Sequence, residues 1–218
     1  MITPAEFYRS LPGNLQQKFS EWSDFLYNDV EVNMPDSPLH AMGHCERVLF
    51  HALFMGNREM GGQDFEALEI LAHAAVFHDT RRLDEYQDTG HGARAAVYYE
   101  DFCRQPDCDI TFHPEAACLM RYHDLDDKVG IEAIRKAFPE NHGRVEKLYA
   151  IFKDADALDR WRLGRWGLDE KYLRTPSSRL LVEAARRLVN ATMSPEVLDH
   201  YDRLVDSIMR KKNKDNTK

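Results

Sequence analysis

Apolar residues recur along most of the chain at intervals of three and four, the spacing that places them on one face of an α-helix. In the segment 15–30, for example, Leu15, Phe19, Trp22 and Leu26 fall on one stripe. The same pattern predicts further helices at residues 36–56, 64–79, 92–104, 114–124, 129–137, 142–160, 179–192 and 194–211. Strand-like alternation is confined to residues 29–34, so we expect an all-α helical bundle.

The pattern also predicts how the chain is organised. No linker, repeat or low-complexity segment divides residues 1–218, and we expect a single domain. Asp36 or Ser37 is expected to cap the helix at 36–56, and Gly56 is expected to end it. The C-terminal helices are expected within 177–211, and the charged end at 212–218 is predicted to be a disordered tail.

Composition narrows the possible partners. The chain is 43% hydrophobic and 30% charged, with a formal net charge of −8. No basic face favours nucleic acid, so a small molecule is the expected partner. No apolar run reaches the roughly 18–20 residues that span a bilayer, and no secretory signal is visible. The four cysteines form no CxxC pair, so we expect reduced thiols, no membrane partner and a cytoplasmic location.

The helix at 64–79 raises a chemical question, because its apolar run ends in His78 and Asp79. Burying an imidazole and a carboxylate is costly unless a partner compensates them, and a bound cation is one such partner. His44 lies on the stripe of the preceding helix, and His40 lies four residues before it, a spacing that can hold a metal. A solvated helix end is the alternative for His40 and His44.

A third helix carries several carboxylates in the stretch FKDADALDRW, among them Asp154, Asp156 and Asp159. These three are spread around the helix, so at most one or two of them can point inward. A buried aspartate needs a partner such as a metal ion or an arginine. The pattern does not decide between Asp154 and Asp156.

The segments HCERV, LAHAAVFHD and DADALD, in that order and each on a helix, resemble the motifs of the HD-domain metal-dependent phosphohydrolase superfamily. The resemblance covers about residues 36–165, which form the expected metal-site core. The stretch from His40 to Ser178 also resembles an uncharacterised bacterial branch of HD proteins. The resemblance to the superfamily implies that His44, His78, Asp79 and Asp156 are metal ligands, with Asp154 as the alternative for the last position, and that Asp79 is catalytic.

Two further histidines fit an extended version of this site. His91 stands in TGHGARAA and His123 in MRYHDLDD, between the His-Asp doublet and the last aspartate. Dinuclear members of the superfamily use two histidines in that order. The resemblance therefore implies that His91 and His123, together with His40, hold a second ion or line the substrate pocket. The alternative is that His91 caps a helix and His123 lies on the surface.

The doublet is followed by Arg81 and Arg82, where several nucleotide-cleaving members of the superfamily keep a glutamate. Arginines suit phosphate oxygens, so both are candidates for phosphate binding, with exposed salt bridges as the alternative. Asp84 or Glu85 could replace the missing acid, which leaves the general base open.

We therefore expect a phosphohydrolase that uses one or two divalent ions of Mn, Fe, Ni, Co or Zn, with Mg possible, on a nucleotide or related phosphoester. A di-iron oxygenase and a non-catalytic metal- or ligand-binding domain are the alternatives. A homodimer is possible.

Overall fold

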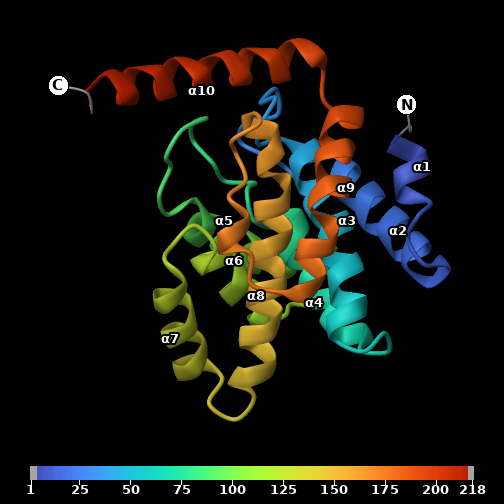
Figure 1. Cartoon of the computed structure of the whole chain (residues 1–218). Coiled ribbons are helices and arrows are strands. Elements are labelled where there is room, and N and C mark those ends of the chain that lie inside the picture. The colour runs from blue at the N-terminus through green and yellow to red at the C-terminus, as the bar shows by residue number, and fades with distance from the viewer. Residues whose placement is uncertain (1–3, 216–218) are drawn as a thin grey trace.

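The protein folds into a bundle of α-helices, which confirms the predicted all-α class (Figure 1). The computed structural model describes the backbone of residues 4–215 and the side chains of residues 4–207, and contains no strand in that part of the chain. The helices are α1 (Pro4–Tyr8), α2 (Gly13–Asp29), α3 (Met42–Glu59), α4 (Phe65–Phe77), α5 (His91–Cys103), α6 (Pro114–Tyr122), α7 (Asp127–Ala137), α8 (His142–Leu158), η1 (Asp159–Leu163), η2 (Glu170–Tyr172), α9 (Pro176–Thr192) and α10 (Pro195–Asp215).

Helix α3 begins later and ends later than the sequence pattern predicts. Ser37 caps a turn before the helix, because its hydroxyl accepts from the backbone N–H groups of Leu39 and His40. His40 therefore lies outside α3. Gly56 lies inside the helix, where an added Cβ would come within 2.6 Å of Leu71. The prediction that Gly56 ends the helix is wrong, since this glycine lets α3 and α4 pack closely.

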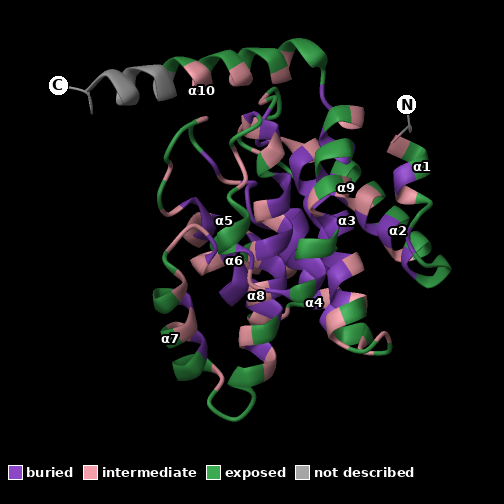
Figure 2. Ribbon diagram, viewed as in Figure 1, coloured by how far each residue is buried: buried purple, intermediate pink, exposed green. Residues whose placement is uncertain are grey.

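The core is centred on α3, α4 and α8, which pack against one another and are each rich in buried residues (Figure 2). Ten residues of α4, from Ala67 to Phe77, are buried, so this helix is apolar all round rather than amphipathic. Asp64 caps it, because its carboxylate accepts from the N–H of Ala67. An anchored helix of this kind holds whatever follows its last turn in a fixed place.

The C-terminal helix α10 lies across one end of the bundle and extends beyond it (Figure 1). Its first turns pack on a small cluster formed by Leu39, Val189 and Met193. The helix continues to Asp215, so residues 212–215 are helical where a disordered tail was predicted. The rest of that predicted tail, residues 216–218, lies outside the described residues.

Candidate metal centre

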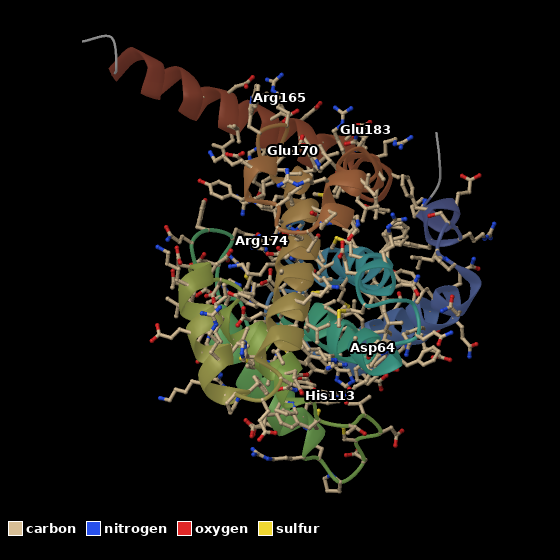
Figure 3. All side chains as sticks on the ribbon, turned by 60° about the horizontal axis from the view of Figure 1, so that its bottom comes forward. Asp64, His113, Arg165, Glu170, Arg174 and Glu183 are labelled. Atoms are coloured by element: carbon tan, nitrogen blue, oxygen red, sulfur yellow. The ribbon has the colours of Figure 1, made fainter. Side chains whose placement is uncertain are left out.

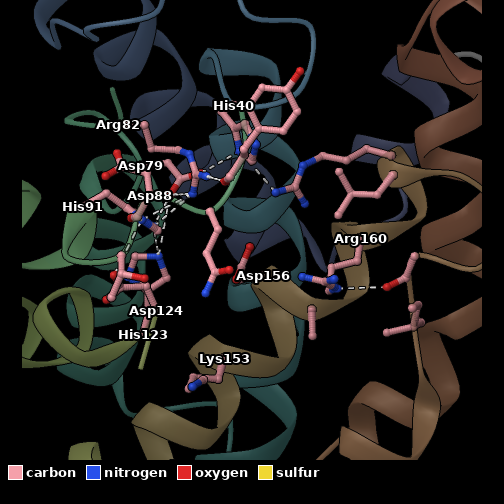
Figure 4. A pocket seen from close by; sticks show the side chains of 18 of the residues that line it. His40, Asp79, Arg82, Asp88, His91, His123, Asp124, Lys153, Asp156 and Arg160 are labelled. Carbon is pink, nitrogen blue, oxygen red and sulfur yellow. Dashed lines mark hydrogen bonds and ion pairs between the residues drawn. The ribbon is translucent and has the colours of Figure 1, made fainter. Parts of the chain in front are cut away.

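A cavity of about 710 Å³ lies where six chain segments meet (Figure 4). One segment precedes α3, one follows α4, one begins α5, one follows α6, one ends α8, and the last runs from η1 to Arg174. His91 and His123 stand on one side of the cavity, Arg160 stands on the other, and Asp156 lies between them. The charged and histidine side chains that line it are His40, Asp79, Arg82, Glu85, Asp88, His91, His123, Asp124, Lys153, Asp156, Arg160, Arg162, Asp169 and Arg174.

His44 is held in one tautomer by groups behind it. Its Nδ1 lies 2.7 Å from Asp159 Oδ2, and Arg47 donates to the same carboxylate through Nε at 2.6 Å. Burial by itself raises the pKa of Asp159, but Arg47 and His44 reverse this, and the pKa lies far below its ordinary value. An ionised Asp159 must accept the Nδ1 proton, so the Nε2 lone pair of His44 faces the site.

His78 reaches the same point from the end of α4. The helix ends at Phe77, and the Nδ1–H of His78 donates to the carbonyl oxygen of Ala75 at 2.9 Å. Burial lowers the pKa of His78 to about 3, so the ring is neutral and Nε2 carries a lone pair. This Nε2 lies 3.1 Å from Nε2 of His44.

His91 and His123 repeat this arrangement. The Nδ1–H of His91 donates to the carbonyl of Asp88 at 2.6 Å, and that of His123 donates to the carbonyl of Met120 at 2.7 Å. Their Nε2 atoms lie 2.9 Å apart. Two lone pairs cannot form a hydrogen bond with each other, so each facing pair is favourable only with a proton or a cation between its nitrogens.

Asp79 lies between the two histidine pairs. Its Oδ2 is 3.4 Å from Nε2 of His44, whereas its Oδ1 is 2.9 Å from Nε2 of His91 and 3.6 Å from Nε2 of His123. Burial alone raises the pKa of Asp79, but the imidazoles around it outweigh burial and hold that pKa well below its ordinary value. One buried carboxylate thus faces all four rings, with Oδ2 toward His44 and Oδ1 toward His78, His91 and His123.

Asp156 completes the cluster, and Asp154 does not. Asp156 Oδ1 lies 3.4 Å from Nε2 of His44. Asp154 is fully buried on another side of α8, where it accepts from the backbone N–H groups of Arg174 and Thr175 and from the guanidinium of Arg174. Arg174 also pairs with Asp127 and so ties α7 to α8 (Figure 3). The structure therefore gives Asp154 a structural role and leaves Asp156 free to act as a ligand.

Of the remaining predicted site residues, some line the cavity and one does not. His40 lies against the cluster, with Nδ1 3.1 Å from Asp79 Oδ2, although it precedes α3. Arg82 lines the cavity, and its Nη1 is 3.8 Å from Asp79 Oδ1. Arg81 does not line the cavity. Its guanidinium stacks 3.3 Å above the Tyr98 ring and donates to the carbonyl of Glu31, because successive residues of this turn point in different directions. Arg81 is thus wrongly predicted as a phosphate contact.

Of the two acids proposed to replace a missing glutamate, only one faces the cavity. The carboxylate of Asp84 accepts from the N–H of Tyr86 and shapes the loop. Glu85 lines the cavity, and its Oε2 is buried without a hydrogen-bond partner, 3.9 Å from Nε2 of His40.

Sequence reasoning missed two residues of this site. Asp159 was expected only as one of several carboxylates around α8, yet it holds His44. The available signal was Arg47, three residues after His44 and so on the same helix face, because an arginine on a buried face requires an anion. Arg162, also buried at the cavity wall, carried no sequence signal that we can identify.

Three overlapping groups of buried or partly buried side chains have ligand atoms within 4.8 Å of one another and can hold a metal ion. They are His40–His44–Asp79, His44–His78–Asp156 and His78–Asp79–His123. No protein-family model, curated protein or solved structure matches the chain. Fold and site therefore define its class: an all-α protein with a buried His–Asp cluster suited to a metal. Within the described residues, no helix has both the length and the apolar character to cross a bilayer.

Proposed function

We propose that the protein is a divalent-metal-dependent phosphohydrolase of the HD type, acting on a small phosphorylated compound such as a nucleotide or related phosphoester. One observation carries the proposal. Four imidazole Nε2 atoms face each other in two pairs around the single carboxylate of Asp79, at the wall of a cavity that five cationic side chains help to line.

The donor set supports transition metals. Imidazole nitrogens mixed with carboxylate oxygens suit Mn²⁺, Fe²⁺, Co²⁺, Ni²⁺ or Zn²⁺ better than Ca²⁺, and Mg²⁺ is possible. The lone-pair contacts at 3.1 Å and 2.9 Å supply an independent reason for a cation at each pair. His44, His78, Asp79 and Asp156 would hold one ion, and His91, His123 and the other oxygen of Asp79 would hold a second.

The chain supplies orientation and charge. When bound, a divalent ion lowers the pKa of a water molecule and neutralises the charge that develops on a phosphoryl group. The Nδ1–H contacts to Asp159, Ala75, Asp88 and Met120 keep the rings in the required tautomer and prevent them from turning.

Glu85 is the candidate for proton transfer. Its unpartnered Oε2 lines the cavity beside His40, so it can accept a proton from a water molecule or give one to a leaving oxygen. Asp84 is engaged with its own loop and cannot do so without breaking that contact.

The test is a phosphate-release screen over nucleotides and sugar phosphates, with the protein supplied in turn with Mn²⁺, Co²⁺, Ni²⁺, Zn²⁺ and Mg²⁺. We expect hydrolysis with at least one ion and none in the presence of EDTA. A blank screen with every metal would refute the phosphohydrolase proposal, provided that metal analysis shows the site to be loaded.

The second histidine pair also favours another candidate, a di-iron oxygenase, because six side chains, Asp79 among them, could together hold two irons. The two proposals differ in a measurable way. Two irons per chain with consumption of O₂ would support the oxygenase, whereas phosphate release with Mn²⁺ would support the hydrolase. A protein that binds no divalent metal, and whose melting temperature is unchanged in Asp79→Ala, would refute both and leave a non-catalytic domain.

A further inference from the structure

Buried polar atoms without partners gather at the cavity. Among the described residues, seven buried side-chain nitrogen and oxygen atoms lack a hydrogen-bond partner, and four of these belong to cavity-lining residues. They are Oε2 of Glu85, Oδ1 of Asp124, and Nε and Nη1 of Arg162. A buried donor or acceptor without a partner costs about 1–3 kcal/mol, so such atoms are expected where a ligand supplies the missing contacts.

Arg162 differs from the other four cations of the cavity wall. Lys153 contacts Asp127 and the carbonyl of Leu125, and Arg174 pairs with Asp127 and Asp154. Arg82 donates to the carbonyl of Tyr86. Arg160 is solvent-exposed and donates through Nε to the carbonyl of Gly167. Arg162 alone in this group is 4% exposed and keeps two nitrogens without a hydrogen-bond partner.

The contacts around Arg162 hold its position without using all of its donors. Nη1 lies 3.6 Å from Asp159 Oδ2, an ion pair too long for a hydrogen bond. Nη2 lies 3.4 Å from Nδ1 of His40, which is itself 3.1 Å from Asp79 Oδ2. A ring nitrogen cannot both donate to a carboxylate and accept from a guanidinium. The shorter contact to Asp79 takes the His40 proton, which leaves Arg162 further short of acceptors.

The 3₁₀ geometry of η1 explains why this arginine faces the site. Residues three apart eclipse in a 3₁₀-helix, so Asp159 and Arg162 lie on one face. Asp159 supports His44, and Arg162 reaches the cavity beside His40. The guanidinium therefore stands next to the proposed metal centre.

We propose that Arg162 binds the terminal oxygens of a phosphoryl group and selects phosphomonoesters over phosphodiesters. The selection between esters rests on the proposed phosphohydrolase function, whereas the binding of a phosphoryl group by Arg162 does not depend on it. Six carboxylates and five cations line the cavity, so divalent ions make its wall net positive and suited to a dianion. A monoester has three terminal oxygens and close to two negative charges, whereas a diester has two oxygens and one charge. A buried guanidinium with free donors gains more from the monoester.

The test measures binding and turnover separately. Inorganic phosphate is titrated calorimetrically into manganese-loaded wild type, Arg162→Met, Arg162→Lys and the control Arg104→Met, whose arginine is exposed on the far end of α5 and pairs with Glu100. We expect the phosphate Kd to rise about 10- to 100-fold in Arg162→Met, less in Arg162→Lys, and not at all in the control. Manganese titration of each variant shows that the centre is intact.

Turnover of p-nitrophenyl phosphate and bis(p-nitrophenyl) phosphate then gives the specificity. We expect Arg162→Met to lower the monoester-to-diester ratio of kcat/KM. An Arg162→Met protein that binds manganese and phosphate as the wild type does would overturn the inference, and so would a wild type that binds no phosphate. If phosphate binding depends on Arg162 but neither ester is hydrolysed, the inference stands and the phosphohydrolase proposal fails.

Discussion

Helix α4 and the turn after it carry two buried histidines whose surroundings differ in one respect. Burial lowers the pKa of both His73 and His78 to about 3, so both rings are neutral. His73 meets a donor: the Tyr99 hydroxyl accepts from the N–H of His113 and gives its own proton to Nδ1 of His73, 2.9 Å away. His78 meets another lone pair, that of His44.

Burial alone therefore does not distinguish a structural histidine from a candidate ligand. The two kinds of histidine are distinguished by the atom that faces the ring nitrogen with the lone pair, a hydroxyl donor at His73 and another imidazole nitrogen at His78. At Nδ1 of His73 a hydroxyl proton lies between the two partner atoms, whereas at Nε2 of His78 two lone pairs face each other. Four predictions can break or sharpen this comparison.

The largest effect is expected for Asp79→Asn. This change keeps the size of the side chain but removes the charge that both histidine pairs face, so metal affinity should fall by more than about 100-fold. Calorimetry with Mn²⁺ or Zn²⁺ measures it, with the exposed Asp101→Asn as the control. Unchanged affinity in Asp79→Asn would contradict the placement of the ions.

The next effect concerns stoichiometry. His123→Asn removes one nitrogen of the second pair and leaves His44, His78 and Asp156 in place, so metal content should fall from two ions per chain to one. Elemental analysis after dialysis measures it. A wild type that binds a single ion, with His123→Asn binding it equally well, would show that the second pair holds no metal.

Much of this picture could be predicted from the sequence. The apolar spacing gave the helices, and the order His44, His78–Asp79, Asp156 indicated residues that the structure does bring together. The sequence argument for His40 assumed that it lies one helical turn before His44. This assumption was wrong, because Ser37 starts a turn there and α3 begins at Met42. Arg81 failed because the direction of a side chain in a turn depends on its neighbours, here Tyr98 and the carbonyl of Glu31.

Arg162 shows a limit of periodicity. A continuous α-helix would place it about 120° around the axis from Asp156. The change to 3₁₀ geometry at Asp159, with about 120° per residue, turns it closer to the face of Asp156. The spacing of apolar residues does not predict where an α-helix changes to 3₁₀ geometry. The apolar pattern also could not decide whether Asp154 or Asp156 is the last ligand. The structure distinguishes them, because the backbone N–H groups of Arg174 and Thr175 donate to Asp154.

Two carboxylates of this stretch, Asp159 and Asp154, give the third prediction. Asp159→Asn weakens the hold on His44, and loss of such a supporting contact lowers metal affinity by about 10- to 100-fold. Asp154→Asn, on the same stretch of chain, should leave metal affinity unchanged and lower the free energy of unfolding by about 1–3 kcal/mol, because it holds the start of α9. Metal titration and urea denaturation of both variants measure these effects. Equal metal affinities in the two variants would contradict the role given to Asp159.

The smallest expected effect concerns His73, the structural histidine of the comparison, and the pH dependence of stability that it causes. The pKa of His73 is about 3 in the folded protein, lowered by burial and then by His113, against an ordinary value of 6.5. Below pH 6.5 the unfolded chain therefore binds a proton that the folded chain excludes, and stability falls as the pH drops toward 3. Each pH unit in that window costs about 1.4 kcal/mol from this one group.

His73→Gln removes this contribution. We expect the variant to be less stable than the wild type at pH 6.5, because the buried ring that packs on Trp22 is lost, but to lose stability less steeply between pH 6.5 and 4.5. Urea denaturation of the two metal-free proteins in EDTA measures both slopes. Metal affinity at neutral pH should be equal in the two proteins, because His73 belongs to none of the groups of described residues that can hold a metal ion. A His73→Gln protein with wild-type pH dependence would mean that this ring is charged in the folded state, and the distinction between the two histidines of α4 would then have to rest on His78 alone.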